Sequence, residues 1–110
     1  MARVLLVDDD ASQLEIRRMI FEHAGHEVRV ASSPEEAVGC AASFLPEVAI
    51  TDLRMPRVED GIALVRRLAV SMRVMVLSGT GVDAASLVGA ERIFTKPCRM
   101  ADLLAAVDRR

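Results

Sequence analysis

A chain of 110 residues, of which 52% are hydrophobic and 27% charged, can bury its own core and is too apolar to be disordered. Its net charge of −2 argues against the basic surface that a free-standing nucleic-acid-binding domain needs. The apolar run Val4–Val7 is too short for a signal peptide or a membrane-spanning helix. The sequence predicts one domain over residues 1–110, with neither nucleic acid nor membrane as a direct partner.

The two cysteines, Cys40 and Cys98, lie far apart in the sequence and outside any Cys/His cluster. We therefore expect neither a disulfide framework nor a zinc site, and a reducing compartment, the cytoplasm, fits this cysteine usage. Both residues are expected to behave as small, buried apolar side chains.

Five short runs rich in Val, Ile and Leu show little alternation of polar and apolar residues, which is typical of strands buried on both faces. These runs are Val4–Val7, Val28–Ala31, Val48–Thr51, Val74–Leu77 and Ile93–Thr95. Helix-length amphipathic stretches separate them, so the sequence predicts five β/α units.

The first helix is expected after Asp10, whose side chain can cap it, and Gly25 fits the left-handed position at its end. The apolar residues expected to face the sheet are Leu14, Ile16, Met19, Ile20 and Ala24. The charged residues expected to face solvent are Glu15, Arg17, Arg18 and Glu22.

The second helix has the clearest start in the chain. Ser33 can cap it, Pro34 suits the first helical position, and Glu36 completes a capping box three residues after Ser33. Its end is predicted near Pro46. A third helix is expected to follow Gly61.

Two more helices are predicted, a short one over roughly Asp83–Val88 and a last one over about Met100–Asp108. The five β/α units then form an open parallel sheet with helices on both faces, a doubly wound α/β sandwich with right-handed crossovers. In this architecture ligands bind beyond the carboxyl ends of the strands. The residues directly after each strand are therefore the candidate site.

Acids follow the first and third strands, at Asp8-Asp9 and Asp52, and Ser78 and Lys96 follow the fourth and fifth. If the first and third strands are neighbours, Asp8 or Asp9 meets Asp52 in one cleft, where close carboxylates favour a cation between them. Oxygen ligands without His or Cys favour Mg²⁺. Lys96 is the sole lysine among 14 basic residues, which suggests a point charge for an anion.

These strand ends resemble the receiver domain of bacterial two-component response regulators, the chemotaxis-regulator-like family. The matching stretches are VLLVDDD at 4–10, DLRMP at 52–56 with DG at 60–61, VLSG at 76–79 and GAERIFTKP at 89–97. The stretches follow the family's order, and the resemblance covers essentially the whole chain. The resemblance implies a flavodoxin-like sheet with strand order 2-1-3-4-5.

The resemblance also implies a phosphoacceptor switch, a signalling domain and not an enzyme. Asp52 would take a phosphoryl group from the phosphohistidine of a sensor histidine kinase or a phosphotransfer protein. Ser78, Lys96 and the backbone of Gly79 would contact the phosphoryl oxygens, and a downstream target protein would read the switched surface. The implied Mg²⁺ ligands are Asp8, Asp9, Asp52 and the backbone carbonyl of Arg54.

Four features depart from the family pattern. The stretch over residues 55–61 is one residue longer than M-P-x-x-D-G, and the span from Ser78 to Lys96 is about one helical turn short. Ser78 and Ile93 stand at the two switch positions, where threonine and an aromatic residue are usual. Gly79 replaces the commoner alanine. We therefore expect an unusual output surface.

The alternative hypothesis is a receiver-like interaction module that works without phosphate, which Ile93 and the short span favour and the Asp–Ser–Lys set opposes. A phosphatase of the haloacid dehalogenase type needs an acid where Arg54 stands, and a flavodoxin-like FMN carrier needs a phosphate loop where the three aspartates stand. The chain fits a stand-alone regulator or a receiver from a longer protein, and the sequence sets no oligomeric state.

Overall fold

The computed structural model describes residues 1–54, 57–79 and 89–108. Within them, five parallel strands pair in the order β2-β1-β3-β4-β5, which confirms the predicted α/β architecture. The strands are β1 (Arg3–Val7), β2 (Glu27–Ala31), β3 (Val48–Asp52), β4 (Arg73–Ser78) and β5 (Arg92–Thr95). The helices are α1 (Ala11–His23), α2 (Pro34–Phe44), α3 (Val58–Leu68) and α4 (Met100–Asp108). The helix expected at 83–88 lies outside the described residues.

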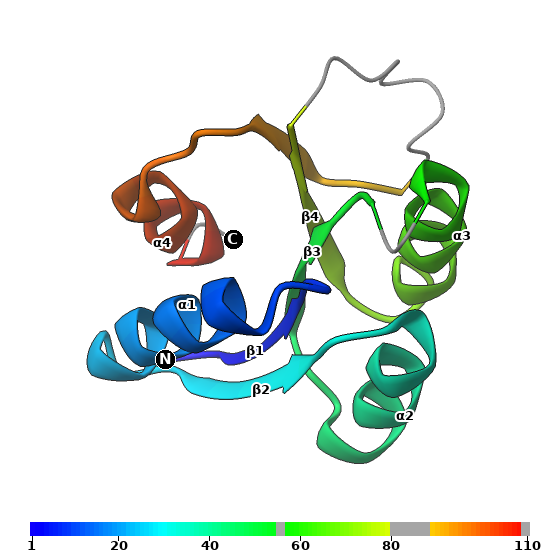
Figure 1. The fold of residues 1–110 in the computed structure, drawn as a ribbon. Coiled ribbons are helices and arrows are strands. Elements are labelled where there is room, and N and C mark those ends of the chain that lie inside the picture. The colour runs from blue at the N-terminus through cyan, green and yellow to red at the C-terminus, as the bar shows by residue number, and fades with distance from the viewer. Residues whose placement is uncertain (55–56, 80–88, 109–110) are drawn as a thin grey trace.

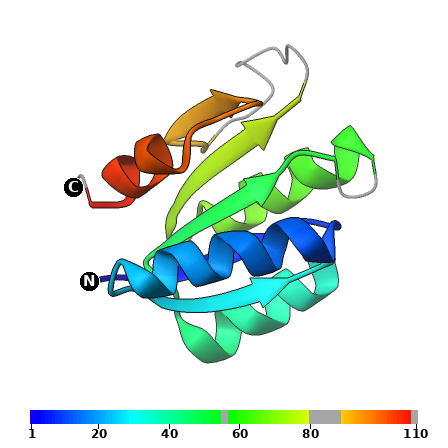
Figure 2. The ribbon, with the colours of Figure 1, turned by 60° about the vertical axis from the view of Figure 1, so that its left-hand side comes forward.

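Helices cover both faces of the sheet, with α1 and α4 on one side and α2 and α3 on the other (Figure 1 and Figure 2). A hydrophobic core lies on each face of the sheet, and the central strands contribute side chains to both. In β1, Val4 and Leu6 face α1 and α4, while Leu5 and Val7 face α2 and α3. Because successive side chains of a strand point to opposite faces, such a strand is apolar at every position.

The two edge strands contradict the expectation that all five strands are buried on both faces. In β2, Glu27, Arg29 and Val30 are exposed, and in β5 only Phe94 is half-buried while its three neighbours in the strand are exposed. Each edge strand has a neighbouring strand on one side only, so its other side is open to solvent. Hydrophobic composition alone does not distinguish an edge strand from a central one.

Only part of the predicted face of α1 meets the sheet. Leu14, Arg17 and Phe21 are buried, whereas Ile16 and Met19 are 52% and 59% exposed. The buried residues are spaced by three and four positions and therefore share one helix face. This face carries Phe21, which brings more apolar surface to the core than any other side chain of the helix. The prediction that Arg17 faces solvent was wrong.

Both predicted caps of the first two helices form, the second in altered shape. Asp10 accepts hydrogen bonds from the backbone N–H groups of Ser12 and Gln13 at 2.9 and 3.3 Å. The hydroxyl of Ser33 accepts from the backbone N–H of Glu36 at 3.1 Å. The second hydrogen bond of the capping box differs from the expected one, because the Glu36 carboxylate accepts hydrogen bonds from the backbone N–H and hydroxyl of Ser32 and not from Ser33.

Helix α3 begins at Val58, so the expectation that it starts after Gly61 was wrong. Gly61 lies inside the first turns and packs against the backbone of Leu53, where an added Cβ would stand 1.7 Å from the carbonyl oxygen. Only glycine permits this approach. The contact places the start of α3 directly over the residue that follows Asp52.

Cys40 and Cys98 are free and partly buried, and burial raises the pKa of both thiols. Among the helices that the structure describes, none combines the length and apolarity needed to cross a membrane.

Candidate functional site

Three carboxylates meet at the carboxyl ends of β1 and β3. These strands are direct neighbours, with Val7 paired to Thr51, so the residues that follow them emerge at the same edge of the sheet. One oxygen from each of Asp8, Asp9 and Asp52 lies within 4.8 Å of the others. The sequence-based expectation that these acids converge is confirmed.

Within this cluster, the carboxyl of Asp9 has a raised pKa. Desolvation raises the pKa of its carboxyl, and so do the negative charge of Asp8, a hydrogen bond with Asp8 and the negative charge of Asp52. A carboxylate whose pKa is raised by its neighbours gains stability from a nearby cation. Because the donors are carboxylate oxygens without sulfur or imidazole nitrogen, the cluster fits a hard ion such as Mg²⁺.

Lys96 reaches the same cluster from the other side. Its Nζ donates a hydrogen bond to Oδ2 of Asp52 at 2.7 Å, and the backbone N–H of Arg54 donates to Oδ1 at 3.3 Å. Lys96 is positioned by the β4–β5 pairing, since its backbone N–H donates to the carbonyl of Ser78 at 2.7 Å. The Lys96–Pro97 peptide bond is cis.

A hollow of about 350 Å³ lies in front of Asp52. Its lining residues are Asp52, Leu53, Arg54, Val58, Ser78, Gly79 and Lys96. Ser78 is buried at the end of β4, while Gly79 is exposed and has nothing within 4 Å of an ideal Cβ. The residues predicted to act on a phosphoryl group therefore share one small open space with the predicted acceptor.

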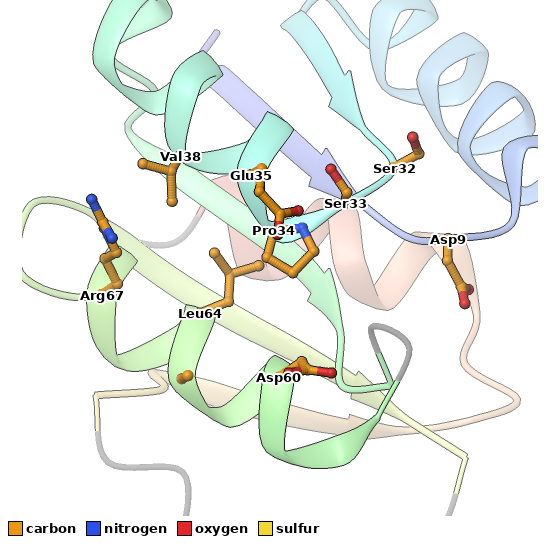
Figure 3. A pocket seen from close by; sticks show the side chains of 10 residues that line it. Asp9, Ser32, Ser33, Pro34, Glu35, Val38, Asp60, Leu64 and Arg67 are labelled. Carbon is orange, nitrogen blue, oxygen red and sulfur yellow. The ribbon is translucent and has the colours of Figure 1, made fainter.

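A larger groove of about 760 Å³ runs between the start of α2 and helix α3 and extends to Asp9 (Figure 3). Pro34 and Leu64 provide apolar walls, and Arg67 lines the end of the groove away from Asp9. Asp52 and Lys96 line the smaller hollow instead. The predicted phosphoryl acceptor and Lys96 thus lie in the smaller of these two spaces.

Sequence reasoning missed Arg17, a buried cation beside the cluster. Its Nη1 donates to Oδ2 of Asp8 at 2.8 Å, and the two side chains are 10% and 2% exposed. Oδ1 of Asp8 accepts from the backbone N–H of Asp10 at 2.9 Å. Its only sequence signal is the position of Arg17 between Leu14 and Phe21 on one helix face, and the stripe of Ile16 and Met19 has helical spacing as well.

The predicted switch residues lie on β4 and β5. Ile93 is 37% exposed, and the adjacent Phe94 packs against the core beneath α1 and α4, as expected for neighbouring positions of a strand. The guanidinium of Arg92 stands 5.0 Å from the centre of the Phe94 ring. The lengthened stretch at 55–61 and the short span from Ser78 to Lys96 lie partly outside the described residues.

The sequence pattern of the response regulator receiver domain matches residues 4–108. The chain belongs to the response regulator receiver domain family. Relatives of this receiver domain include the virulence transcriptional regulatory protein PhoP of Salmonella typhimurium strain LT2, 34% identical over 113 aligned positions, which cover 96% of this chain and 50% of PhoP. The transcriptional regulatory protein PhoP of Escherichia coli K12 is 33% identical over 111 positions, covering 94% of this chain and 49% of that protein. The chain spans about half the length of these curated relatives.

Solved structures agree with this assignment. A response regulator receiver domain protein from Clostridium thermocellum is 29% identical with a TM-score of 0.87, and the match covers 97% of this chain and 91% of that one. The chemotaxis response regulator CheY4 of Vibrio cholerae is 28% identical with a TM-score of 0.84, covering 99% and 98%.

Proposed function

We propose that this receiver domain is a phosphorylation switch that accepts a phosphoryl group on Asp52 in a Mg²⁺-dependent reaction. The observation that carries the proposal is the setting of Asp52. Its carboxylate faces an open hollow, bonds to the ammonium of Lys96 at 2.7 Å, and lies within 4.8 Å of two more carboxylates. A nucleophile, a cation and an oxygen-rich metal site are what phosphoryl transfer to a carboxylate requires.

The proposed donor is the phosphohistidine of a sensor histidine kinase or a phosphotransfer protein. An oxygen of Asp52 forms the new bond to phosphorus while the phosphorus–nitrogen bond of the phosphohistidine breaks. The electron pair of the broken bond remains on the imidazole nitrogen. Lys96 can follow the negative charge onto the phosphoryl oxygens because its stem is flexible. The Ser78 hydroxyl and the Gly79 backbone supply further contacts at the wall of the hollow.

The acidic cluster would hold the metal through Asp9 and Asp52, with Asp8 and the Arg54 carbonyl as the other ligands that the resemblance implies. When bound, Mg²⁺ would neutralise the charge of the transferring phosphoryl group. The protein's own contribution is to hold these oxygens at the edge of a rigid sheet. Asp8 follows four buried residues of β1, and Asp52 ends β3 after four buried residues, which limits the motion of both.

Phosphorylation would shift a pre-existing equilibrium between two conformations, and a downstream partner would read the favoured one. The PhoP relatives are named as transcriptional regulatory proteins and are about twice as long as this chain. We therefore infer a signalling domain of the cytoplasm that works through protein partners and not as an enzyme on a separate substrate.

Intact-mass spectrometry after incubation with acetyl phosphate tests this function directly. We expect one phosphoryl adduct that requires Mg²⁺, disappears in Asp52→Asn and persists in Asp102→Asn, an exposed-acid control on α4. An adduct of equal extent in Asp52→Asn would show that another residue is the acceptor. A folded protein without any adduct would favour the phosphate-independent interaction module.

A further inference from the structure

The ion pair between Arg17 and Asp8 differs from the other charged contacts at the site. Lys96 is one-third exposed, whereas the side chains of Arg17 and Asp8 are 10% and 2% exposed. Both oxygens of Asp8 already accept hydrogen bonds from the protein, one from Arg17 and one from the backbone of Asp10. Arg17 is thus a built-in positive charge of the acidic cluster, in contact with one of its three carboxylates.

The formal charges of the site show what this cation changes. Asp8, Asp9 and Asp52 contribute three negative charges, and Lys96 and Arg17 two positive ones. A divalent ion brings the sum from −1 to +1. Replacing the single charge of Asp52 by the charge of an acyl phosphate, about −2, returns the sum to about zero. Without Arg17, the metal alone would balance the site, and the phosphoryl group would leave it negative.

We propose that Arg17 is a positioning residue that biases the acidic cluster toward its phosphorylated state. It holds Asp8 and opposes a divalent cation in the unphosphorylated protein, and it offsets the extra negative charge once Asp52 carries a phosphoryl group. This role rests on the proposed function. It predicts effects of opposite sign on two ligands, because a positive charge repels Mg²⁺ and attracts a phosphoryl analogue.

Arg17→Gln tests the proposal, because glutamine removes the charge and keeps an N–H donor. Titration calorimetry with MgCl₂ measures the affinity of the unphosphorylated protein for the metal. Titration with beryllofluoride, an anionic phosphoryl analogue, at saturating Mg²⁺ measures the second affinity. We expect Mg²⁺ to bind about three- to tenfold more tightly to Arg17→Gln, and beryllofluoride to bind more weakly by a similar factor.

Two variants serve as controls. Arg18→Gln removes the neighbouring charge, which is paired with Glu15 and Glu22 on the outer side of α1, and should leave both affinities unchanged. Arg17→Lys keeps the charge and should stay within about twofold of the wild type for both ligands. If Arg17→Gln does not fold, Arg17→Met, which suits the apolar surroundings of Leu14 and Phe21, replaces it.

These measurements distinguish a positioning role of Arg17 from a merely structural ion pair. An Arg17→Gln protein that loses thermal stability while both affinities stay the same, or fall together, would show a merely structural ion pair and overturn the proposal. In that case Asp52-dependent phosphorylation would still be observed by mass spectrometry, so the proposed function would stand. Absence of Mg²⁺ binding in wild type and variant alike would overturn both.

Discussion

The Nζ atom of Lys96 lies 2.7 Å from Oδ2 of Asp52, although the two residues are 44 positions apart in the chain. They meet because β3, β4 and β5 are consecutive neighbours whose carboxyl ends share one edge of the sheet. The only lysine of the protein therefore contacts the predicted phosphoryl acceptor.

Replacing Lys96 with methionine should slow phosphoryl uptake while leaving the fold intact. The ammonium donates a charge-assisted hydrogen bond, and its loss removes stabilisation of the negative charge that develops on the transferred group. We expect the rate of uptake from acetyl phosphate to fall about 10- to 100-fold. Time-resolved intact-mass spectrometry measures the rate, and Arg99→Met, at an exposed arginine, is the matched control. A Lys96→Met protein that matches the control would remove lysine from the proposed mechanism.

Asp9→Asn should stabilise the metal-free protein and abolish the stabilisation that Mg²⁺ confers. The pKa of Asp9 is raised by desolvation and by the charges of Asp8 and Asp52, so its ionised form is unfavourable in the folded state. The neutral amide removes this repulsion together with one metal ligand. Thermal unfolding with and without MgCl₂ checks both effects. A Mg²⁺-dependent rise in Tm that survives in Asp9→Asn would contradict the assignment of Asp9 as a ligand.

Two glycine-to-alanine variants in neighbouring helices should shift stability in opposite directions. Gly61→Ala places a methyl group against the backbone of Leu53, so we expect a loss of at least about 2 kcal/mol in the free energy of unfolding. Gly39 has nothing within 4 Å of an ideal Cβ and lies inside α2, so Gly39→Ala should gain about 0.5–1 kcal/mol. Urea unfolding followed by circular dichroism suits a chain without Trp or Tyr. Equal effects of the two substitutions would argue against the close packing of α3 on Leu53.

The pair of Glu91 and Arg73 should make stability depend on acid pH. Arg73 lowers the pKa of Glu91 through a hydrogen bond and its charge, and it also donates to the carbonyls of Ala106 and Val107 at the end of α4. A carboxyl with a lowered folded-state pKa stabilises the protein above its unfolded pKa, and this contribution disappears as the pH falls through the folded-state value.

We therefore expect the wild type to lose more stability than Glu91→Gln between about pH 6 and about pH 3. The difference should stay below about 1 kcal/mol, because Glu91 is exposed enough for solvent to screen the pair. Urea unfolding at both pH values provides the comparison. Parallel pH profiles of the two proteins would mean that this pair contributes nothing measurable.

Much of the architecture and of the site was predictable from local sequence. The central strands are largely apolar runs, Asp10 and Ser33 are capping residues directly before helices, and the acids and Lys96 stand at or directly after the ends of strands. These signals depend on a few neighbouring residues and on the rule that the carboxyl ends of parallel strands share an edge. The convergence of Asp8, Asp9 and Asp52 follows once β1 and β3 are neighbours.

Tertiary structure decided which side of each element is buried. The stripe of Ile16 and Met19 and the stripe of Leu14 and Phe21 both have helical spacing, and only contact with the sheet selects the second. That choice buries Arg17, and the cost of burying its charge is offset by Asp8, a partner nine residues away. Local sequence predicts where helices and strands form, but burial depends on what packs against them, and this is why the cation beside the acidic cluster became visible only in the folded chain.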